Sequence, residues 1–263
     1  MSESLIIHGV TGSQPARSVY WTCLIKGLPF ELRPVDLASP EARGLLLELN
    51  PTGQVPTIED GGFVLYEMPA ILTYLCEKHG WADLLPTDLR TRSRINQYLH
   101  FHHNSTRRLS AELMAPHVIV AILDQLGDSD YLSDIVERAH APDKLAIGRR
   151  TAQHVAELIE TGYFRNGHRF LCTGEPTIAD LACYEELAQL RWADLYDFEG
   201  FPKLRAWLDE MQALPFHYEA HLYNTTLGDI RSEPNTVERM AAAMGASLSA
   251  LVGLAGAGVR VRG

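Results

Sequence analysis

The order of hydrophobic and polar positions divides the chain into a mixed first part and a helical second part. Up to about residue 80, a short apolar run at Leu5–Gly9 precedes helix-like stretches at Pro15–Lys26 and Pro40–Leu49. Two strand-like runs, VPTIE and FVLYE, flank residues 60–62 (DGG), and this predicts a hairpin because glycine accepts the positive φ of tight turns. The predicted order is strand, helix, strand, helix, hairpin and helix. Residues 1–80 should therefore form a small α/β domain with a mixed sheet.

The second part of the chain shows helical spacing only. After Gly80 the strand signals end, and residues 87–225 carry repeated apolar stripes at helical intervals. One helix should begin after Thr177, where Asp180 occupies the carboxylate position of a capping box. This assigns Asp180 a structural role, so its replacement should destabilise the fold and leave the chemistry unaltered. We expect an all-helical second domain over residues 87–225.

Residues 226–263 form a tail whose structure the pattern leaves open. It contains an uncharged run from Met240 to Val259 that is long enough to cross a bilayer. Alanine and glycine dominate the run, however, and make it only weakly hydrophobic. A packing helix or a disordered tail fits better than a membrane anchor.

Composition and charge exclude some partners. The chain has 263 residues, of which 46% are hydrophobic, and a formal net charge of -10. This charge repels nucleic acid and anionic lipid, so neither is expected as a main partner. The N-terminus has no evident signal peptide. The cysteines form no C-x-x-C pair, and together these features predict a reducing, cytoplasmic setting. They are Cys23, Cys76, Cys172 and Cys183.

Candidate chemistry first occurs in the stretch GSQPAR, at the start of the first helix. A helix N-terminus stabilises an anion through its free N–H groups and its partial positive charge. A hydroxyl there, that of Ser13, could donate a hydrogen bond to a thiolate and lower its pKa. The alternative is that Ser13 serves only as the N-cap of the helix.

A second candidate region is NPTGQVPTIEDGGFVLYEMPAI. Val55-Pro56 begins a strand, and a cis bond there would leave the backbone of Val55 free to pair with an extended peptide. The hairpin then returns Glu67 and Met68 to the same end of the sheet. Glu67 can accept from an ammonium group, and the N–H of Met68 can donate to a carboxylate. These groups suggest an amino-acid-like ligand.

The same stretches resemble a known family. NPTGQVPTIEDGGFVLYEMPAILTYL is similar to the glutathione-binding half of a glutathione S-transferase, and GSQPARSVYWTCLIKGLPFELRPVDL resembles the theta class. RINQYLHFHHNSTRR and LCTGEPTIADLACYEEL resemble later segments of that family, so the likeness covers about residues 4 to 223. It implies a thioredoxin-like domain followed by a helical bundle, in a homodimeric cytoplasmic enzyme. The implied reaction conjugates glutathione to small hydrophobic electrophiles in detoxification, with possible peroxide reduction or dehalogenation and without a metal.

The resemblance also implies roles for single residues. The hydroxyl of Ser13 would hold the glutathione sulfur as a thiolate, and Val55 would pair with the cysteinyl part beside a cis-Pro56. Gln54 would contact the glycyl end, while Glu67 and the N–H of Met68 would hold the γ-glutamyl group. Further candidates are Arg43 for the glycyl carboxylate, Arg107 near the active site by its match to the family, and, for the electrophile pocket, His102, Met114, His117 and Tyr131.

Met68 is where the chain departs from the family pattern, which has a serine after the acidic residue. Loss of that hydroxyl donor should weaken glutathione binding by about threefold to a hundredfold. This leaves open an alternative function as a catalytically weak binding or scaffold module with the same fold. A metal site at His100 and His103 is not expected, because no third ligand accompanies them. Cys23 lies inside a predicted helix, where a thiol is expected in the core. The resemblance disfavours thiol exchange, because the classes of the family that reduce disulfides have a cysteine where this chain has Ser13.

Overall fold

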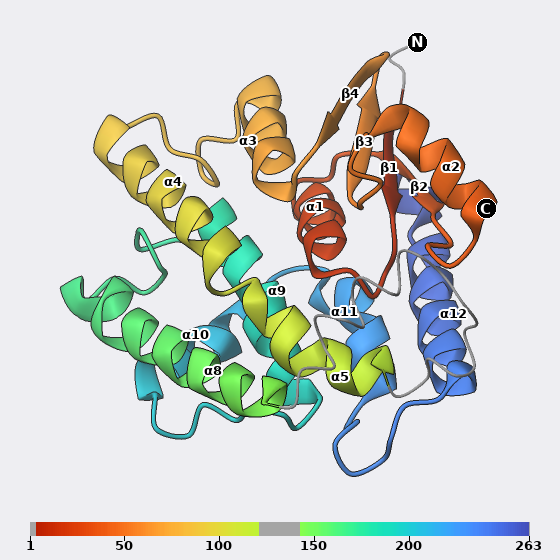
Figure 1. Ribbon diagram of the computed structural model, residues 1–263. Helices are drawn as coiled ribbons and strands as arrows, with labels where there is room; N and C mark the ends of the chain where they lie inside the picture. Colours follow the sequence, from red (N-terminus) through yellow and green to blue (C-terminus); the bar gives the residue numbers. More distant parts are fainter. Residues whose placement is uncertain (1–3, 121–142, 263) are drawn as a thin grey trace.

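The computed structural model describes residues 4–120 and 143–262 and has a sheet domain beside a helical domain (Figure 1). The sheet domain follows the predicted order of elements. These are β1 (Leu5–Gly9), α1 (Gln14–Ile25), β2 (Phe30–Pro34), α2 (Pro40–Leu49), β3 (Thr57–Asp60), β4 (Phe63–Tyr66) and α3 (Met68–His79). Strand β1 pairs parallel to β2 and antiparallel to β3, and β3 pairs antiparallel to β4. The sheet is therefore mixed, as the hairpin signal predicts.

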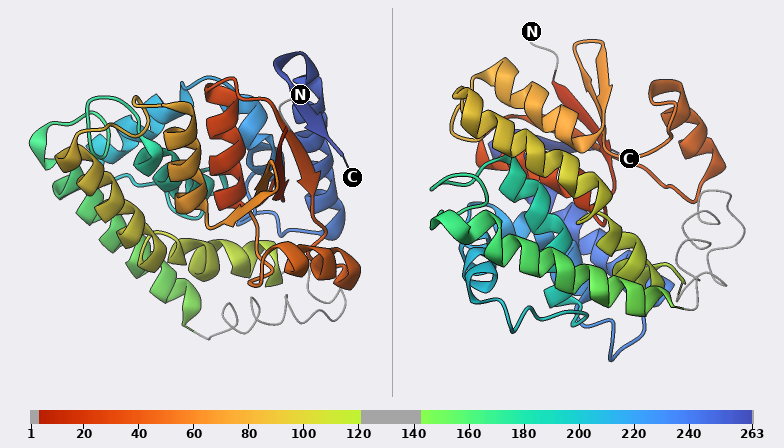
Figure 2. Two further views of the ribbon diagram at one scale, coloured as in Figure 1. Left: turned by 90° about the horizontal axis from the view of Figure 1, so that it is seen from above. Right: turned by 60° about the vertical axis from the view of Figure 1, so that its left-hand side comes forward.

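The helical domain lies against α1. Its elements are α4 (Leu89–Asn104), the π-helix η1 (Ser110–Met114), α5 (Ala115–Val118), α8 (Lys144–Thr161), the 3₁₀ helix η3 (Tyr163–Asn166), α9 (Ile178–Trp192), α10 (Pro202–Gln212) and α11 (His217–Leu227). Helix α1 packs on α9 and α11 and separates them from the strands (Figure 2). The predicted capping box begins α9, since Thr177 and Asp180 each bond the other's backbone N–H. Residues 121–142, among them Tyr131, lie outside the described part of the chain.

The last residues return to the sheet. After α11 come α12 (Val237–Gly253), the short 3₁₀ helix η4 (Ala255–Ala257) and β5 (Val259–Val261), which pairs parallel to β2. The strand order is thus β4-β3-β1-β2-β5. Strand β5 was not predicted, because three residues are too few to show an alternating pattern. The segment left open by the sequence therefore supplies one edge of the sheet.

Helix α12 explains the uncharged run near the C-terminus. It packs beside α11 and buries Ala243, Ser247 and Leu251, which lie four residues apart on one face. Most of the run thus belongs to a packing helix, one of the two alternatives that the sequence favours, and its end forms η4 and the start of β5. No helix among the described residues is long and apolar enough to cross a membrane.

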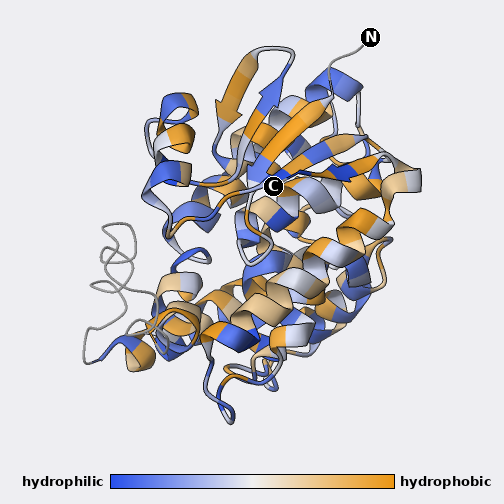
Figure 3. Cartoon of the chain, turned by 90° about the vertical axis from the view of Figure 1, so that its right-hand side faces the viewer, coloured by the Kyte–Doolittle hydropathy of each residue, from blue (hydrophilic) through white to orange (hydrophobic). Residues whose placement is uncertain are grey.

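One continuous core joins the two domains. Trp21 on α1 and Trp207 on α10 belong to the same cluster of buried side chains as Val259 on β5. Figure 3 shows hydrophobic stretches along the strands and alternating hydrophobic and hydrophilic stretches along the helices. All four cysteines are free and buried. Because this core is shared, α1 packs against both the sheet and the helical domain.

Candidate active site

Strand register brings three candidate segments to one edge of the sheet. His8 on β1 pairs with Thr57 on β3, and Thr57 pairs with Tyr66 on β4. Because the strands are antiparallel, the chain after β1, the chain before β3 and the chain after β4 leave the sheet at the same end. These three segments carry Ser13, Val55-Pro56 and Glu67.

Ser13 is the N-cap of α1. Its backbone is extended, with φ -80° and ψ 120°, and its Oγ accepts from the N–H of Ala16 at 3.4 Å. The side chain is half-buried, and Pro15 follows in the first turn. The bond to Ala16 is long, and the same oxygen can also donate through its own hydrogen. Capping and hydrogen bonding to a thiolate are therefore compatible roles.

A buried ion pair supports the loop before Ser13 from below. Arg17 donates through Nε to Glu185 at 2.6 Å and through Nη1 to the carbonyl oxygen of Thr11 at 3.1 Å. His221 bonds the other carboxylate oxygen of Glu185 at 2.8 Å. Burial acts to raise the pKa of Glu185, but His221 and Arg17 outweigh it and lower that pKa. The carboxylate is charged, and it fastens the loop to α9.

Arg107 reaches the start of α1 from the helical domain. The chain leaves regular helix after Asn104, and Nη1 of Arg107 lies 3.4 Å from Oε1 of Gln14 and 3.2 Å from Oε1 of Glu186. The guanidinium is 38% exposed and Glu186 is 1% exposed. The structure thus brings Arg107 beside Gln14, the residue that follows Ser13.

The sequence analysis missed Glu185, Glu186 and Gln189. All three are buried in α9, which is otherwise mostly apolar. Charged and amide side chains are rarely fully buried unless they are paired. The signal in the sequence is that these polar residues stand among apolar residues in one helix, which indicates buried side chains with hydrogen-bond partners.

The loop before β3 has the predicted cis peptide bond, between Val55 and Pro56. Asn50 fixes this loop, because its Nδ2 donates to the carbonyl oxygen of Gln54 at 2.9 Å and to Oγ1 of Thr57 at 3.0 Å. Val55 is half-buried and Gln54 is exposed. The backbone of this segment is therefore held firmly while its outer side faces solvent.

Arg43 lies beside the same loop. It is on α2, and its Nη2 would be 3.9 Å from a Cβ atom placed on Gly53. Gly53 has φ +61°, which favours glycine, and precedes Gln54. Arg43 and Gln54 thus both lie beside Gly53.

The side chain of Glu67 is exposed, whereas that of Met68 is buried. Glu67 is the exposed N-cap of α3 and has φ 69° and ψ 109°, a conformation that costs a non-glycine residue about 1–3 kcal/mol. Met68 is 5% exposed, and its side chain belongs to the core. As the first residue of α3, Met68 has an N–H without an intrahelical acceptor. Only the backbone of Met68, and not its thioether, is available at the edge.

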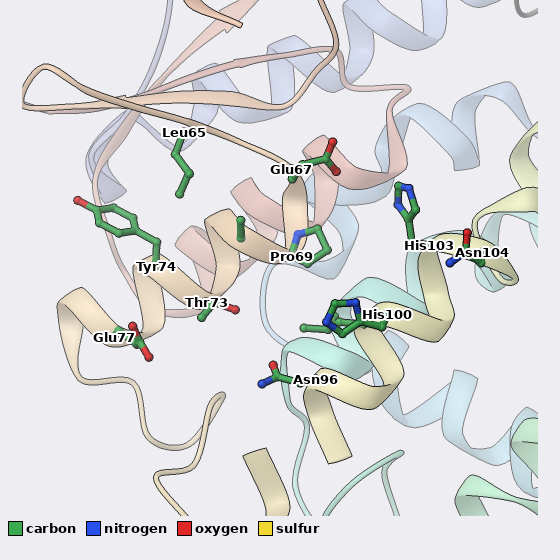
Figure 4. Close-up of a pocket in the computed structure, with 12 residues that line it drawn as sticks. Leu65, Glu67, Pro69, Thr73, Tyr74, Glu77, Asn96, His100, His103 and Asn104 are labelled. Atoms are coloured by element: carbon green, nitrogen blue, oxygen red, sulfur yellow. The ribbon is translucent and has the colours of Figure 1, made fainter. Parts of the chain in front are cut away.

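Glu67 also borders a pocket of about 590 Å³ between α3 and α4. Figure 4 shows Glu67 and Pro69 on the α3 side and His100 and His103 on the α4 side. Among the residues that the structure describes, no three His, Cys, Asp or Glu side chains gather in a group that could hold a metal ion. His100 and His103 both line this pocket.

The remaining candidates are less accessible. His102 is 2% exposed on α4, and burial lowers its pKa to about 3, with Arg107 adding to the shift. Met114 ends η1 and is 6% exposed. His117 bonds the carbonyl oxygen of Leu113 at 2.9 Å. The structure links Arg107 to the start of α1, whereas it places His102 and Met114 in the interior of the helical domain.

This architecture, with a serine-capped helix N-terminus beside a cis-proline loop, matches that of a known family. Residues 7–83 match the family model for the glutathione S-transferase N-terminal domain, and residues 136–216 match the model for its C-terminal domain. Human glutathione S-transferase theta-2B is 32% identical over 208 residues, which cover 76% of this chain and 78% of that protein. The chain belongs to the glutathione S-transferase family.

Within the family the similarity is to the theta class. Human glutathione S-transferase theta-1 is 32% identical over 203 residues, covering 76% of this chain and 79% of the relative. A crystal structure of human glutathione transferase theta-2 in complex with glutathione and an unknown ligand aligns with a TM-score of 0.73 and 27% identity. It covers 94% of this chain and 99% of that structure. A human theta-class structure with the glutathione conjugate of 1-menaphthyl sulfate aligns at 0.72, with 28% identity, 94% coverage of this chain and 98% of the other.

Proposed function

We propose that this protein is a glutathione transferase that joins the thiolate of glutathione to small hydrophobic electrophiles. The observation that carries the proposal is the common edge of the sheet, where Ser13, the Val55-cis-Pro56 loop and Glu67 leave the strands together. A tripeptide that carries an ammonium group, a thiol and two carboxylates fits that set of groups. The names of the theta-class relatives support the same reaction.

Each group has a proposed task. The backbone of Val55 pairs with the cysteinyl residue and brings its sulfur toward Ser13, whose hydroxyl donates to the thiolate. Glu67 accepts from the γ-glutamyl ammonium group, and the N–H of Met68 donates to the neighbouring carboxylate. A hydrogen bond to a charged group contributes about 1.5–3 kcal/mol, which lowers the thiol pKa by roughly 1–2 units. The thiolate then attacks the electrophile and displaces its leaving group, and proximity supplies the rest of the acceleration.

The glycyl end and the electrophile involve further residues. Gln54 and Arg43 are proposed to contact the glycyl carboxylate, since both lie at the same end of the loop. Arg107 is proposed to line the electrophile pocket, because its guanidinium is partly exposed beside the start of α1. We assign His102 and Met114 supporting positions behind that pocket, which suits their burial.

Assembly and location are also proposed. A homodimer fits the open pocket between α3 and α4, next to which Phe63 is 48% exposed. Light scattering should report twice the 29.3 kDa of one chain. A reducing cytoplasm, and a role there in detoxification, suit four cysteines that are free and buried. The alternative of a catalytically weak scaffold is not favoured, because the glutathione-facing motifs and the fold are those of the enzymes.

Ser13 and Ser39 offer a matched test. Ser39 caps α2 with φ -79° and ψ 119°, accepts from Ala42 N–H at 3.3 Å and also precedes a proline. Ser13→Ala and Ser39→Ala should each cost about 1 kcal/mol of stability as lost N-caps. Only Ser13→Ala should lower kcat/KM, by roughly 10- to 150-fold, in glutathione-dependent turnover of a panel of halides and peroxides. Wild type that neither turns over the panel nor binds millimolar glutathione would overturn the proposal.

A further inference from the structure

A closed ring of hydrogen bonds joins the first turn of α1 to the helical domain. Gln14 donates through Nε2 to Oε1 of Gln189, and Gln189 donates through its own Nε2 to Oε2 of Glu186 at 3.2 Å. Arg107 closes the ring, because its Nη1 bonds both Oε1 of Glu186 and Oε1 of Gln14. The amide of Gln14 therefore has both its oxygen and its nitrogen engaged by groups from the other domain.

Glu186 is the member with the most partners. Its Oε1 takes the Arg107 bond at 3.2 Å, and its Oε2 takes Gln189 and the hydroxyl of Ser110 at 2.5 Å. Ser110 reaches it from η1, and Gln189 also donates to Ser110 at 3.1 Å. A π-helical turn shifts side chains relative to a regular helix, and such turns are frequent at functional sites. Glu186 thus contacts Arg107, Ser110 and Gln189. Two of these, Arg107 and Gln189, bond Gln14, which follows Ser13 in the chain.

Glu186 is buried, and burial is costly for a carboxylate. The side chain is 1% exposed, and burial raises its pKa despite Arg107 and Ser110. Its hydrogen bonds to Arg107, Ser110 and Gln189 offset that cost, so these side chains and Glu186 depend on one another for their arrangement.

We propose that Glu186 is a positioning residue for the glutathione reaction. It holds the Arg107 and Gln14 side chains in one arrangement, so that the first turn of α1 presents the Ser13 hydroxyl to the glutathione sulfur. The inference rests on the proposed function, and it assigns Glu186 no contact with either substrate. A misplacement of about 1 Å in a reacting arrangement can cost about a hundredfold in rate, so the loss of one anchor has measurable consequences.

The test removes the carboxylate and keeps the shape of the side chain. In the full-length Glu186→Gln variant, kcat/KM for glutathione conjugation, measured per folded molecule, should fall about tenfold to a hundredfold, mainly in kcat. The pKa of bound glutathione, followed by ultraviolet absorbance of its thiolate, should rise by about one unit. The direction of the change in the thiol pKa distinguishes two effects of the substitution. Removing a negative charge near the sulfur would by itself lower the thiol pKa, whereas loss of the Ser13 contact raises it.

Glu112→Gln is the matched control. Glu112 is 4% exposed on η1 and accepts from Arg108 at 2.9 Å and from Thr151 at 2.6 Å; within residues 4–120 and 143–262 it bonds no group on α1. This variant should keep both wild-type turnover and the wild-type thiol pKa. A double-mutant cycle should show that Gln14→Ala adds little to the loss caused by Glu186→Gln, because both break one ring.

The outcomes separate the two proposals. If wild type binds no glutathione, the proposed function and this inference both fail. If wild type is active but Glu186→Gln leaves the thiol pKa unchanged or lowers it, only the inference fails. A Glu186→Gln protein that loses activity only in step with its folded fraction, while its folded molecules keep the wild-type thiol pKa, also overturns it.

Discussion

Asp180 accepts the indole N–H of Trp207 at 3.0 Å, so the residue that caps α9 also fastens α10 to it. The same carboxylate accepts from the N–H of Leu171 at 2.8 Å and from the N–H and hydroxyl of Thr177, both at 2.9 Å. Four buried donors therefore depend on one side chain.

Replacement of Asp180 should separate stability from chemistry. In Asp180→Ala the four donors lose their acceptor, and the free energy of unfolding should fall by about 3–5 kcal/mol. Specific activity per folded molecule should stay at the wild-type level. Asp88→Ala provides the control, because Asp88 caps α4 at an exposed position and should cost only about 1 kcal/mol. Urea unfolding and turnover at a temperature where both variants are folded measure the difference, and a comparable loss of stability in the two would contradict this account.

The turn into β5 gives a second prediction. Gly258 has φ +86°, and a Cβ atom there would lie 2.9 Å from Cβ of Pro29. Gly258→Ala should therefore lower the free energy of unfolding by about 2 kcal/mol, from backbone strain and overpacking. Gly256→Ala is the control, because nothing lies within 4 Å of its added atom. Equal stability of the two variants would mean that β5 does not pair with β2 in solution.

The sequence predicts those parts of the fold whose signals are local. The bounds Pro40–Leu49 for α2, the hairpin at residues 60–62 and the capping box of Thr177 and Asp180 depend on near neighbours along the chain, and they agree with the structure. Strand β5 depends on a partner strand far away in the sequence. Its three residues carry no periodic signal of their own.

The residues of the candidate site also fall into those with a local sequence signal and those that depend on distant partners. The sequence indicates Ser13 and Glu67 because each begins a helix beside a strand. It does not indicate the ring around Glu186, since Gln14 reaches Gln189 only when α1 packs on α9. The direction of the Met68 side chain likewise follows from packing, because a residue in a first helical turn can face either core or solvent.

Met68→Ser tests the consequence of that direction. Since the side chain is in the core, the serine hydroxyl would enter an apolar site and would not restore a donor to glutathione. The free energy of unfolding should fall by about 3 kcal/mol, and KM for glutathione should remain at the wild-type value. Met68→Leu, which nearly conserves volume, should cost less than about 1.5 kcal/mol. A Met68→Ser protein that binds glutathione several times more tightly would show that the hydroxyl reaches the groove.

Glu67 combines backbone strain with a charge, and two variants separate them. Glu67→Gly relieves the positive φ and should keep or raise stability by up to about 1 kcal/mol after the entropy of glycine is counted. Glu67→Gln keeps the strain and should leave stability unchanged. Both remove the partner of the γ-glutamyl ammonium group, so each should weaken glutathione binding by roughly 10- to 150-fold. Calorimetric titration and thermal unfolding measure the two effects, and unaltered affinity in both variants would remove Glu67 from the site.

Two buried histidines make stability depend on pH. Burial lowers the pKa of His102 and of His217 to about 3, so the folded chain stays neutral at both positions while the unfolded chain takes up protons below about pH 6.5. Because the unfolded state binds more protons, stability falls as pH drops from 6.5 toward 3, by up to about 1.4 kcal/mol per pH unit for each histidine. Urea unfolding between pH 4.5 and 7.5 should show this slope. His102→Gln should reduce it by about one histidine's share. An unaltered slope in His102→Gln would mean that His102 is protonated equally in the folded and unfolded chains.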